Sequence, residues 1–266
     1  MIIKTLVENT AVSDEFFYEH GLSLYIETKN HKIIFDAGQT DLFLKNAQTL
    51  GVDISQVDTV VLSHGHYDHG GGINTLLTEN SKAKILINEN AFGDFYNNSG
   101  KYIGIGQSLK NNERVVLTQD EYKIDEGIFL FSGNTKERPF ETQSDNLFVN
   151  TKQKQELDTF IHEQYLFVVE EDKGVLISGC SHKGIMNILE FSKDFEPDYF
   201  VGGFHFMNIK LDREGENELD NISCELLKYK MKYYTCHCTG VLQYEYLKQN
   251  MGERIEYLSS GKSIVI

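Results

Sequence analysis

The 266-residue chain is poor in cysteine, and it contains no long hydrophobic run. Four cysteines are too few for a disulfide framework in a chain of this length. No segment reaches the roughly 18 apolar residues of a membrane-spanning helix. The first ten residues lack the apolar stretch and the small-residue cleavage site of a secretory signal. We therefore expect a cytoplasmic protein with reduced thiols and no membrane partner.

Positive charge and proline are also scarce. Lysine and arginine total 25 against 40 aspartates and glutamates, which gives a formal net charge of −15. Nucleic-acid-binding proteins usually present a basic face, so we expect no nucleic-acid partner. Only two prolines are present, and no linker-like segment or charge block interrupts the chain. A single domain over residues 1–266 is therefore expected, with enough chain to bury a full core.

Metal-ligand residues, by contrast, are concentrated in one stretch. Residues 59–62 form a β-branched and apolar run, which predicts a buried strand. His64, His66, Asp68 and His69 follow within six positions, and then come three glycines and a helical pattern. The sequence predicts a strand that leads into a polar loop, which turns into a helix.

Imidazole and carboxylate groups are good ligands for Zn²⁺, Fe or Mn. His64 and His66 are two positions apart, so in an extended loop both side chains point to the same side and reach one ion. Asp68 and His69 come after the chain has turned, so we expect them to face a second ion. A single histidine in an apolar pattern is usually a structural residue. Four ligand types together at the end of a strand favour a metal site.

Strands and helices alternate through the rest of the chain. Strands are predicted at residues 1–9, 23–28, 32–35, 83–87, within 113–132, and at 164–169, 174–178, 199–201, 232–235 and 263–266. Helices are predicted at residues 41–50, 71–79, 184–193, 217–230 and 241–250. Two polar segments, 88–112 and 134–155, break this pattern, and the first is expected to form a long lid or rim of an active site.

Three strands of the second half end in a histidine, namely His182, His205 and His237. Strands that place ligands at the same edge of a sheet can assemble a metal site from distant parts of the sequence. His20, His31 and His162 have no such context and are expected to be surface or structural residues.

Basic residues beside the polar segments are each expected to be solvated surface charges; they are Lys101, Lys136, Arg138 and Lys183.

The His-x-His-x-Asp-His pattern at 64–69 resembles the signature of the metallo-β-lactamase superfamily, and Asp36-Ala-Gly38 resembles its acid and glycine after an early strand. Further motifs resemble, in order, those of one branch, the dihydropteroate-synthase-like or 7,8-dihydropterin-6-methyl-4-(β-D-ribofuranosyl)-aminobenzene-5'-phosphate synthase-like proteins. They are Phe35–Gln39, Leu62–Gly71, Ser178–His182, Gly202–His205 and Cys236–Gly240. This resemblance spans nearly the whole chain. It implies an α/β fold, an αββα sandwich of two mixed β-sheets flanked by helices, with two divalent metal ions at the sheet edge.

The resemblance also implies a ligand set. Carried over by position, the first ion would be held by His64, His66 and His182, and the second by Asp68, His69 and His237. The superfamily's Gly-His-Thr segment upstream of a bridging aspartate is not visible in this sequence. Cys180 or His182 must therefore fill one of those positions, with Cys180 either a soft ligand or a buried structural cysteine.

Two further segments leave alternatives open. His205 is expected to be another ligand, a hydrogen-bond partner of a ligand, or a substrate contact, and with Asp68, which would orient a water, it is a catalytic candidate. Cys236-His-Cys238 could form a zinc knuckle, but no Cys-x-x-Cys partner pair is present. His237 is therefore preferred as the ligand, with the two cysteines packed.

The site and the resemblance together imply a metal-dependent hydrolase that acts on a small, anionic phosphoester or phosphodiester through a metal-activated water. The branch implies an alternative, a transferase that condenses a dihydropterin methyl diphosphate with an aminobenzene ribosyl phosphate.

A di-iron redox or sensing protein would need an attached flavodoxin-like or rubredoxin-like domain, for which the chain lacks the length and the cysteine pairs. Hydrolysis of β-lactams is not expected, since no export signal precedes the chain. Zn²⁺ is the default metal, Fe and Mn suit the same ligands, and the oligomeric state is left open.

Overall fold

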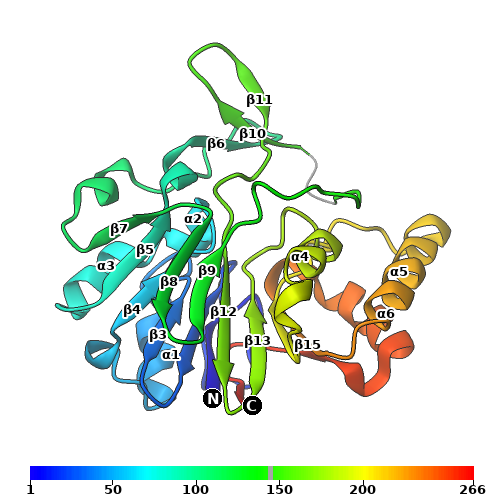
Figure 1. The fold of residues 1–266 in the computed structure, drawn as a ribbon, viewed down its shortest axis with the longest axis horizontal. Coiled ribbons are helices and arrows are strands. Elements are labelled where there is room, and N and C mark those ends of the chain that lie inside the picture. The colour runs from blue at the N-terminus through cyan, green and yellow to red at the C-terminus, as the bar shows by residue number, and fades with distance from the viewer. Residues whose placement is uncertain (143–145) are drawn as a thin grey trace.

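Two mixed seven-stranded sheets lie face to face in the computed structural model, which describes residues 1–142 and 146–266 (Figure 1). The first sheet has the order β17 (Ser263–Val265), β1 (Ile2–Val7), β2 (Ser23–Glu27), β3 (Lys32–Phe35), β4 (Thr59–Val61), β5 (Lys84–Asn88) and β7 (Val115–Thr118). The second has the order β16 (Ile255–Tyr257), β15 (Lys232–Thr235), β14 (Tyr199–Gly202), β13 (Lys173–Ile177), β12 (Tyr165–Glu170), β9 (Ile128–Phe131) and β8 (Glu121–Asp125).

Helices cover the outer face of each sheet. The first sheet is covered by α1 (Leu42–Thr49) and α3 (Ile73–Glu79), and the second by α4 (Ile185–Phe191), α5 (Arg213–Leu226) and α6 (Val241–Met251) (Figure 1). The short helix α2 (Tyr67–Gly70) directly precedes α3. The predicted αββα sandwich is confirmed. Among the described residues, every helix is too short or too polar to cross a lipid bilayer.

The hydrophobic core follows the alternation of side chains along the strands. In β4, Val60 packs toward α1 and α3, whereas Val61 lies between the two sheets. In β5, Ile85 faces the helices and Leu86 faces the other sheet. Successive side chains of a strand point to opposite faces, so strands that are buried on both faces must be apolar throughout. This explains the continuous apolar runs in the sequence.

Each sheet is antiparallel in one half and parallel in the other. Strands β3, β4, β5 and β7 pair in parallel, and so do β13, β14, β15 and β16. The carboxyl ends of parallel neighbours meet at one edge of a sheet, where ligands of such sheets usually bind. The loops that follow β3, β4, β13, β14 and β15 meet at this edge of the sandwich.

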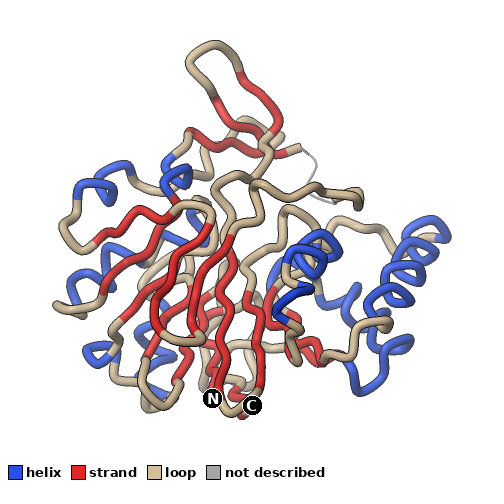
Figure 2. Tube along the Cα trace, viewed as in Figure 1, coloured by secondary structure: helices blue, strands red, loops and turns tan. Residues whose placement is uncertain are grey.

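A third, three-stranded sheet overturns the prediction of two long unstructured segments. It consists of β6 (Asp94–Asn97), β10 (Leu147–Asn150) and β11 (Gln155–Leu157), and it stands above the loops at the upper edge of the main sheets (Figure 2). Asn97 pairs with Leu147, fifty positions later in the sequence. Residues 143–145 of the segment 134–155 lie outside the described residues. The strands were missed because short, half-exposed strands that pair over such a distance have no local hydrophobic alternation.

Two smaller differences concern α5 and β16. Helix α5 begins four residues before its predicted start, because the Asp212 side chain accepts hydrogen bonds from the backbone N–H groups of Glu214 and Gly215. Strand β16 was not predicted from the sequence.

Candidate metal centre

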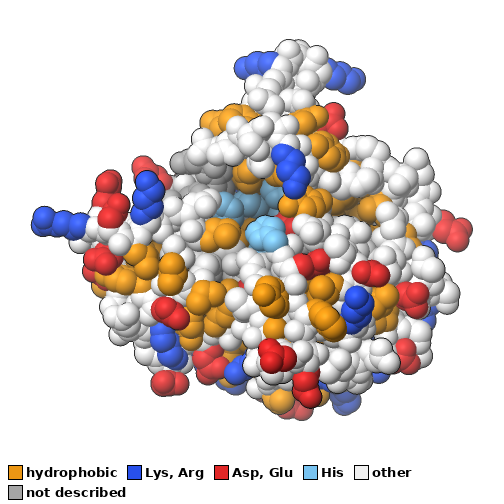
Figure 3. All heavy atoms as spheres, turned by 180° about the vertical axis from the view of Figure 1, so that it is seen from behind, with side chains coloured by type: hydrophobic (Ala, Val, Ile, Leu, Met, Phe, Trp, Pro, Cys, Tyr) orange, Lys and Arg blue, Asp and Glu red, His pale blue; other side chains and the backbone are white. Residues whose placement is uncertain are grey.

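All the predicted ligand candidates meet at the upper edge of the sandwich. His64 and His66 lie in the loop after β4, and α2 begins directly after His66. Three further loops, after β13, β14 and β15, bring His182, His205 and His237 to the same place. Histidine side chains are visible in a hollow beneath the third sheet (Figure 3).

The glycines after the ligand loop are required by close backbone contacts. A Cβ atom at Gly71 would lie 2.1 Å from the carbonyl oxygen of Gln39, and one at Gly72 would lie 2.2 Å from that of Ala37. Any side chain at these positions would push α2 away from the loop after β3. These glycines therefore let the backbone pass closely behind the ligand loop.

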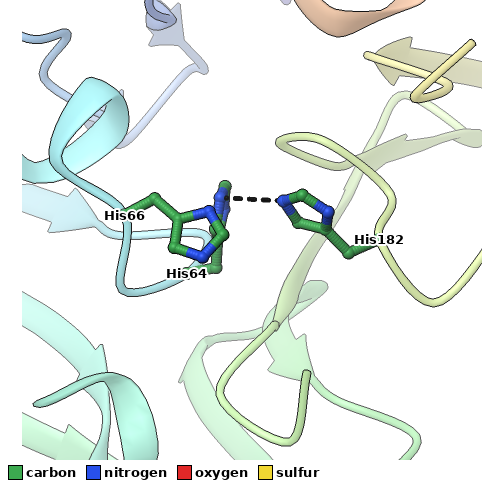
Figure 4. Close-up of side chains that lie close together, drawn as sticks. All are labelled: His64, His66 and His182. Carbon is green, nitrogen blue, oxygen red and sulfur yellow. Dashed lines mark hydrogen bonds between the residues drawn. The ribbon is translucent and has the colours of Figure 1, made fainter. Parts of the chain in front are cut away.

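One group of three imidazoles could hold an ion. The ring nitrogens of His64, His66 and His182 lie within 4.8 Å of one another, and all three rings are buried. His64 Nε2 and His182 Nε2 face each other at 3.3 Å (Figure 4). His66 Nε2 is buried and makes no hydrogen bond to any described residue. Buried polar atoms are almost always paired, so this nitrogen indicates a missing partner such as a metal ion.

A second group lies beside the first and is centred on Asp68. The Oδ2 atom of Asp68 lies 3.6 Å from His69 Nε2 and 3.4 Å from His237 Nε2. Cys180 Sγ lies 3.2 Å from His69 Nε2, and these two atoms and a ring nitrogen of His64 lie within 4.8 Å of one another. The Cys180 thiol is thus placed between the two groups.

Hydrogen bonds to the other ring nitrogens set the orientation of the imidazoles. Asp36 Oδ2 accepts from His69 Nδ1 at 2.6 Å and from the Ser63 hydroxyl at 2.7 Å. Ser63 Oγ lies 2.8 Å from His64 Nδ1. With Nδ1 donating, the Nε2 lone pairs of His64 and His69 point into the cluster, which is the arrangement found in metal-binding histidines.

His237 is oriented in the same way from the N-terminal segment. Its Nδ1 lies 2.8 Å from the side-chain oxygen of Asn9, and its backbone N–H donates to Glu8 Oε1 at 2.7 Å. His237 also has a positive φ of 50°, as do Asp36, Ser181 and His205 at 59°, 59° and 61°. Such left-handed conformations are uncommon in residues other than glycine and concentrate at functional sites.

The protonation states suit cation binding. Burial lowers the pKa of His66 to about 3 and that of His237 to about 4, and it holds the pKa of His64 and His182 well below its usual value. For Asp68, burial acts to raise the pKa, but His69 and other neighbours hold it well below its usual range. At neutral pH the cluster therefore offers neutral imidazoles and a charged carboxylate, the forms that bind divalent metals.

His69 differs from these four rings. Burial acts to lower its pKa, but the carboxylates of Asp36 and Asp68 raise it above the usual value. His69 thus lies between the two carboxylates, with Nδ1 against Asp36 and Nε2 facing Asp68 and Cys180.

A cavity of about 190 Å³ opens onto the cluster. Its floor is formed by site residues, and its cover comes from the third sheet and the segment after β6; the covering residues are Asn97, Ile103 and Leu147. The backbone N–H of Tyr67 donates to the carbonyl oxygen of Ile103 at 2.8 Å. The segment expected to be a lid or rim is therefore an ordered structure that lines the cavity and is hydrogen-bonded to the ligand loop.

Sequence reasoning missed two residues of metal-ligand type that line this cavity. His20, expected to be surface or structural, has its Nε2 atom 3.3 Å from Asp68 Oδ2 and is about half exposed. Cys238, expected only to be packed, also lines the cavity. The Cys-His-Cys segment was a signal for Cys238, whereas nothing near His20 in the sequence indicates its place.

Two further buried residues lie outside the cavity. The Nδ1 of His162 accepts from the Gly65 N–H at 3.0 Å and its Nε2 contacts Asp158 at 2.9 Å, and one ligand atom each of His162, Asp158 and His66 lie within 4.8 Å of one another. The expected structural role of His162 stays a prediction. Lys183 was expected to be a solvated charge, but it is fully buried, which lowers its pKa to about 7. Its Nζ donates to the carbonyl oxygens of Ser132 and Glu163. Lys183, which follows the strand-end residue His182, is therefore buried beneath its loop and is not exposed on the surface.

Comparison with known proteins agrees with the fold. The model of the metallo-beta-lactamase superfamily matches residues 19–189, and the chain belongs to this superfamily. An uncharacterized protein of Methanocaldococcus jannaschii is 32% identical over 90% of this chain and 91% of its own length. The 7,8-dihydropterin-6-methyl-4-(beta-D-ribofuranosyl)-aminobenzene-5'-phosphate synthase of the same organism is 28% identical over 98% of this chain and 95% of its own. The predicted resemblance to this branch is thus confirmed.

Among solved structures, Tm1679, described as a metal-dependent hydrolase of the beta-lactamase superfamily, superposes with a TM-score of 0.85. It is 28% identical, and the match covers 100% of this chain and 99% of Tm1679. The likeness therefore extends over both sheets and the loops that form the candidate metal centre.

Proposed function

We propose that the chain is a metal-dependent hydrolase with a dinuclear site, which cleaves a phosphoester or phosphodiester bond of a small anionic molecule. The observation that supports this proposal is the unpaired Nε2 of His66 within a cluster of buried, inward-pointing imidazoles. His64, His66 and His182 would hold one ion. The residues for the other ion would be Asp68, His69 and His237, with Cys180 between the two groups.

Two divalent ions bound here would supply a water of lowered pKa and positive charge opposite the oxygens of the phosphoryl group. The residues of the chain would position the reactants. Asp68 is anionic, so its carboxylate can accept a hydrogen bond from the attacking water and orient it. His205, whose ring lies 4.4 Å from that of His182, faces the cavity where a leaving group would lie.

The surroundings of the cavity agree with a small anionic substrate. Lys101 is exposed and lies with its Nζ atom 4.7 Å from the ring of Tyr67, which lines the cavity. The cover formed by Ile103 and Leu147 excludes bulk water from part of the cavity. In such a setting, electrostatic attraction between the site and a phosphate group is stronger than in water.

The proposal is tested by metal analysis combined with a model substrate. Wild type, His66→Ala and the control His31→Ala are analysed by plasma mass spectrometry and assayed with bis(nitrophenyl) phosphate. Two equivalents of metal in wild type and in the control, with metal and activity both lost in His66→Ala, are expected. Wild-type protein that binds no metal after incubation with Zn²⁺, Fe²⁺ or Mn²⁺ would overturn the proposal.

A transferase is the second candidate, and the specific observation in its favour is the 28% identity to the pterin synthase over nearly the full chain. Displacement of diphosphate from a dihydropterin methyl diphosphate by an aminobenzene ribosyl phosphate uses the same electrostatic stabilisation of phosphoryl oxygens. Diphosphate release that requires both cosubstrates, without cleavage of the model diester, would favour this candidate over the hydrolase.

A further inference from the structure

Two cysteines that are far apart in the sequence flank His237 at the cavity. Cys180 follows β13 and Cys238 follows β15, and their Sγ atoms and a ring nitrogen of His237 all lie within 4.8 Å of one another. All three residues are buried and line the same cavity as His66 and Asp68. Three soft or borderline ligand atoms at this separation can reach one ion.

We infer that Cys180 and Cys238 are thiolate ligands of the ion on the His237 side of the centre. This inference rests on the proposed metal-dependent function and adds to it a softer ligand set, in which each thiol loses its proton to solvent when the metal binds. Cys180 lies between the two groups of ligands, 3.2 Å from His69 Nε2, while Cys238 lies farther along the His237 side.

The balance of charge in the cavity supports thiolate ligation. Two divalent ions bring four positive charges into a buried site, and buried charge is costly unless it is compensated. Among the described residues that line the cavity, Asp68 is the one carboxylate. The imidazoles are neutral ligands. Two thiolates, Asp68 and a hydroxide would place four negative charges on the ligand atoms themselves, whereas Asp68 and a hydroxide alone would place two, with the Asp36 carboxylate behind His69 as one further negative charge.

The backbone leaves space for the Cys238 sulfur. A Cβ atom at Gly203 would lie 2.4 Å from Cys238 Sγ, so a side chain at this position would displace the thiol from the cavity. The neighbouring Cys236 behaves differently, because it packs between the two sheets with residues such as Val201. The two cysteines of the Cys-His-Cys segment therefore have different environments, and only Cys238 is placed beside the candidate ligands.

A thiolate-containing site has a defined metal preference. Thiolates favour Zn²⁺ and other soft or borderline ions, whereas Mn²⁺ prefers carboxylate, carbonyl and water oxygens. The His237 side of the centre should therefore bind Zn²⁺ or Co²⁺ and take up little Mn²⁺.

Cobalt spectroscopy tests this inference without relying on activity. Metal-free wild type and the variants Cys180→Ser, Cys238→Ser and the double variant are titrated with Co²⁺ under reducing conditions. Cys224, which is exposed on α5, provides the matched control Cys224→Ser. Ligand-field bands in the visible range report cobalt binding, and sulfur-to-cobalt charge-transfer bands in the near ultraviolet report thiolate ligation.

We expect charge-transfer bands in wild type and Cys224→Ser, weaker bands in each single variant, and their loss in the double variant. Retained ligand-field bands in the double variant, from ions held by the histidines, would show that the protein still folds and binds metal. Ligand-field bands without charge-transfer bands in wild type would overturn the thiolate inference and leave the proposed function intact. Absence of both types of band would overturn the metal-dependent proposal itself.

Discussion

Asp36 and His69 are joined by a 2.6 Å contact between a carboxylate oxygen and Nδ1, and both side chains are fully buried. Asp36 comes directly after β3, and His69 lies on α2, so this contact connects two neighbouring loops at the edge of the first sheet. The same carboxylate accepts hydrogen bonds from the backbone N–H and the hydroxyl of Ser63, at 2.7 Å each. One side chain thus determines the orientation of the ligand loop.

Replacement of Asp36 by asparagine should weaken metal binding. The amide would place an NH₂ group opposite the Nδ1–H of His69, so this hydrogen bond would become a contact between two donors. We expect zinc affinity to fall by about 10- to 100-fold, measured by competition with a chromophoric chelator. The exposed Asp14→Asn should bind zinc as wild type does. Equal affinity in Asp36→Asn and wild type would contradict the orienting role.

Metal loading should raise thermal stability. A ligand that binds only the folded state stabilises it by about 2.7 kcal/mol when present at about 100 times its dissociation constant. We expect the melting temperature to rise by several degrees on addition of Zn²⁺ to metal-free wild type and to return after chelation. His66→Ala should show a smaller rise. An identical rise in this variant would argue against His66 as a ligand.

Glu163 should be essential for the loop that carries His182. Its carboxylate is buried and accepts from the backbone N–H groups of His182 and Lys183, at 2.7 and 3.0 Å, and from the Tyr165 hydroxyl at 2.6 Å. Glu163→Gln would leave at least one of these donors unpaired, which should cost about 1–3 kcal/mol of unfolding free energy. Urea unfolding of the metal-free protein measures this cost.

The matched control for this change is Glu79→Gln on the exposed face of α3, which should alter the unfolding free energy by less than about 0.5 kcal/mol. If Glu163→Gln were as stable as Glu79→Gln, the loop would have to be held by other contacts.

His31 should make the free energy of unfolding depend on pH. Burial acts to lower its pKa, but hydrogen bonds to Asp125 and Asp58 raise it above the usual value. Because the pKa of His31 is higher in the folded than in the unfolded state, the protonated ring stabilises the fold. This stabilisation is fully present below about pH 6.5 and is lost as the pH rises through the pKa that His31 has in the folded state. His31→Gln should therefore destabilise the protein more at about pH 5 than at about pH 9.

Urea unfolding at both pH values, with the neighbouring Asn30→Gln as control, measures this difference. The bridge from His31 joins the first sheet to Asp125 of β8 in the second sheet, so its loss should also reduce the contact between the sheets. A His31→Gln effect that is the same at both pH values would rule out a role for the protonated ring.

Lys101→Ala should weaken the binding of an anionic substrate. Because Lys101 is exposed beside Tyr67 at the mouth of the cavity, we expect KM for bis(nitrophenyl) phosphate to rise several-fold and kcat to change little. The effect should diminish at high salt, since exposed charges are screened. Lys110→Ala, an exposed lysine over Phe92, is the control. A fall in kcat at constant KM would place Lys101 in the chemical step instead.

The central part of the site was predictable from the sequence because it is local. His64, His66, Asp68 and His69 follow one buried strand, so their spacing alone defines their relative directions. The strand-end histidines were also predictable, since parallel strands bring their carboxyl ends together. The two-sheet sandwich followed from the family resemblance, whereas the apolar runs predicted only where strands and helices lie.

Other features depend on contacts that no local pattern encodes. His20 precedes β2 and meets Asp68 only because the first sheet brings the two loops together. Strand β6 exists only because β10 pairs with it. Lys183 is buried because the carbonyl oxygens of Ser132 and Glu163 accept hydrogen bonds from its Nζ. The single-domain expectation and the exclusion of nucleic acid stay predictions.

The spacing of the site along the chain has a consequence for biosynthesis. His64 and His237 are separated by 173 positions, so the loop after β15 is made well after the loop after β4. A growing chain that has reached only β4 and α2 presents a few imidazoles on an incomplete sheet, without the residues that enclose an ion. Metal acquisition is therefore a late event, which follows translation of β15, and a ribosome-bound chain truncated before this strand should retain little of the metal that the finished protein binds.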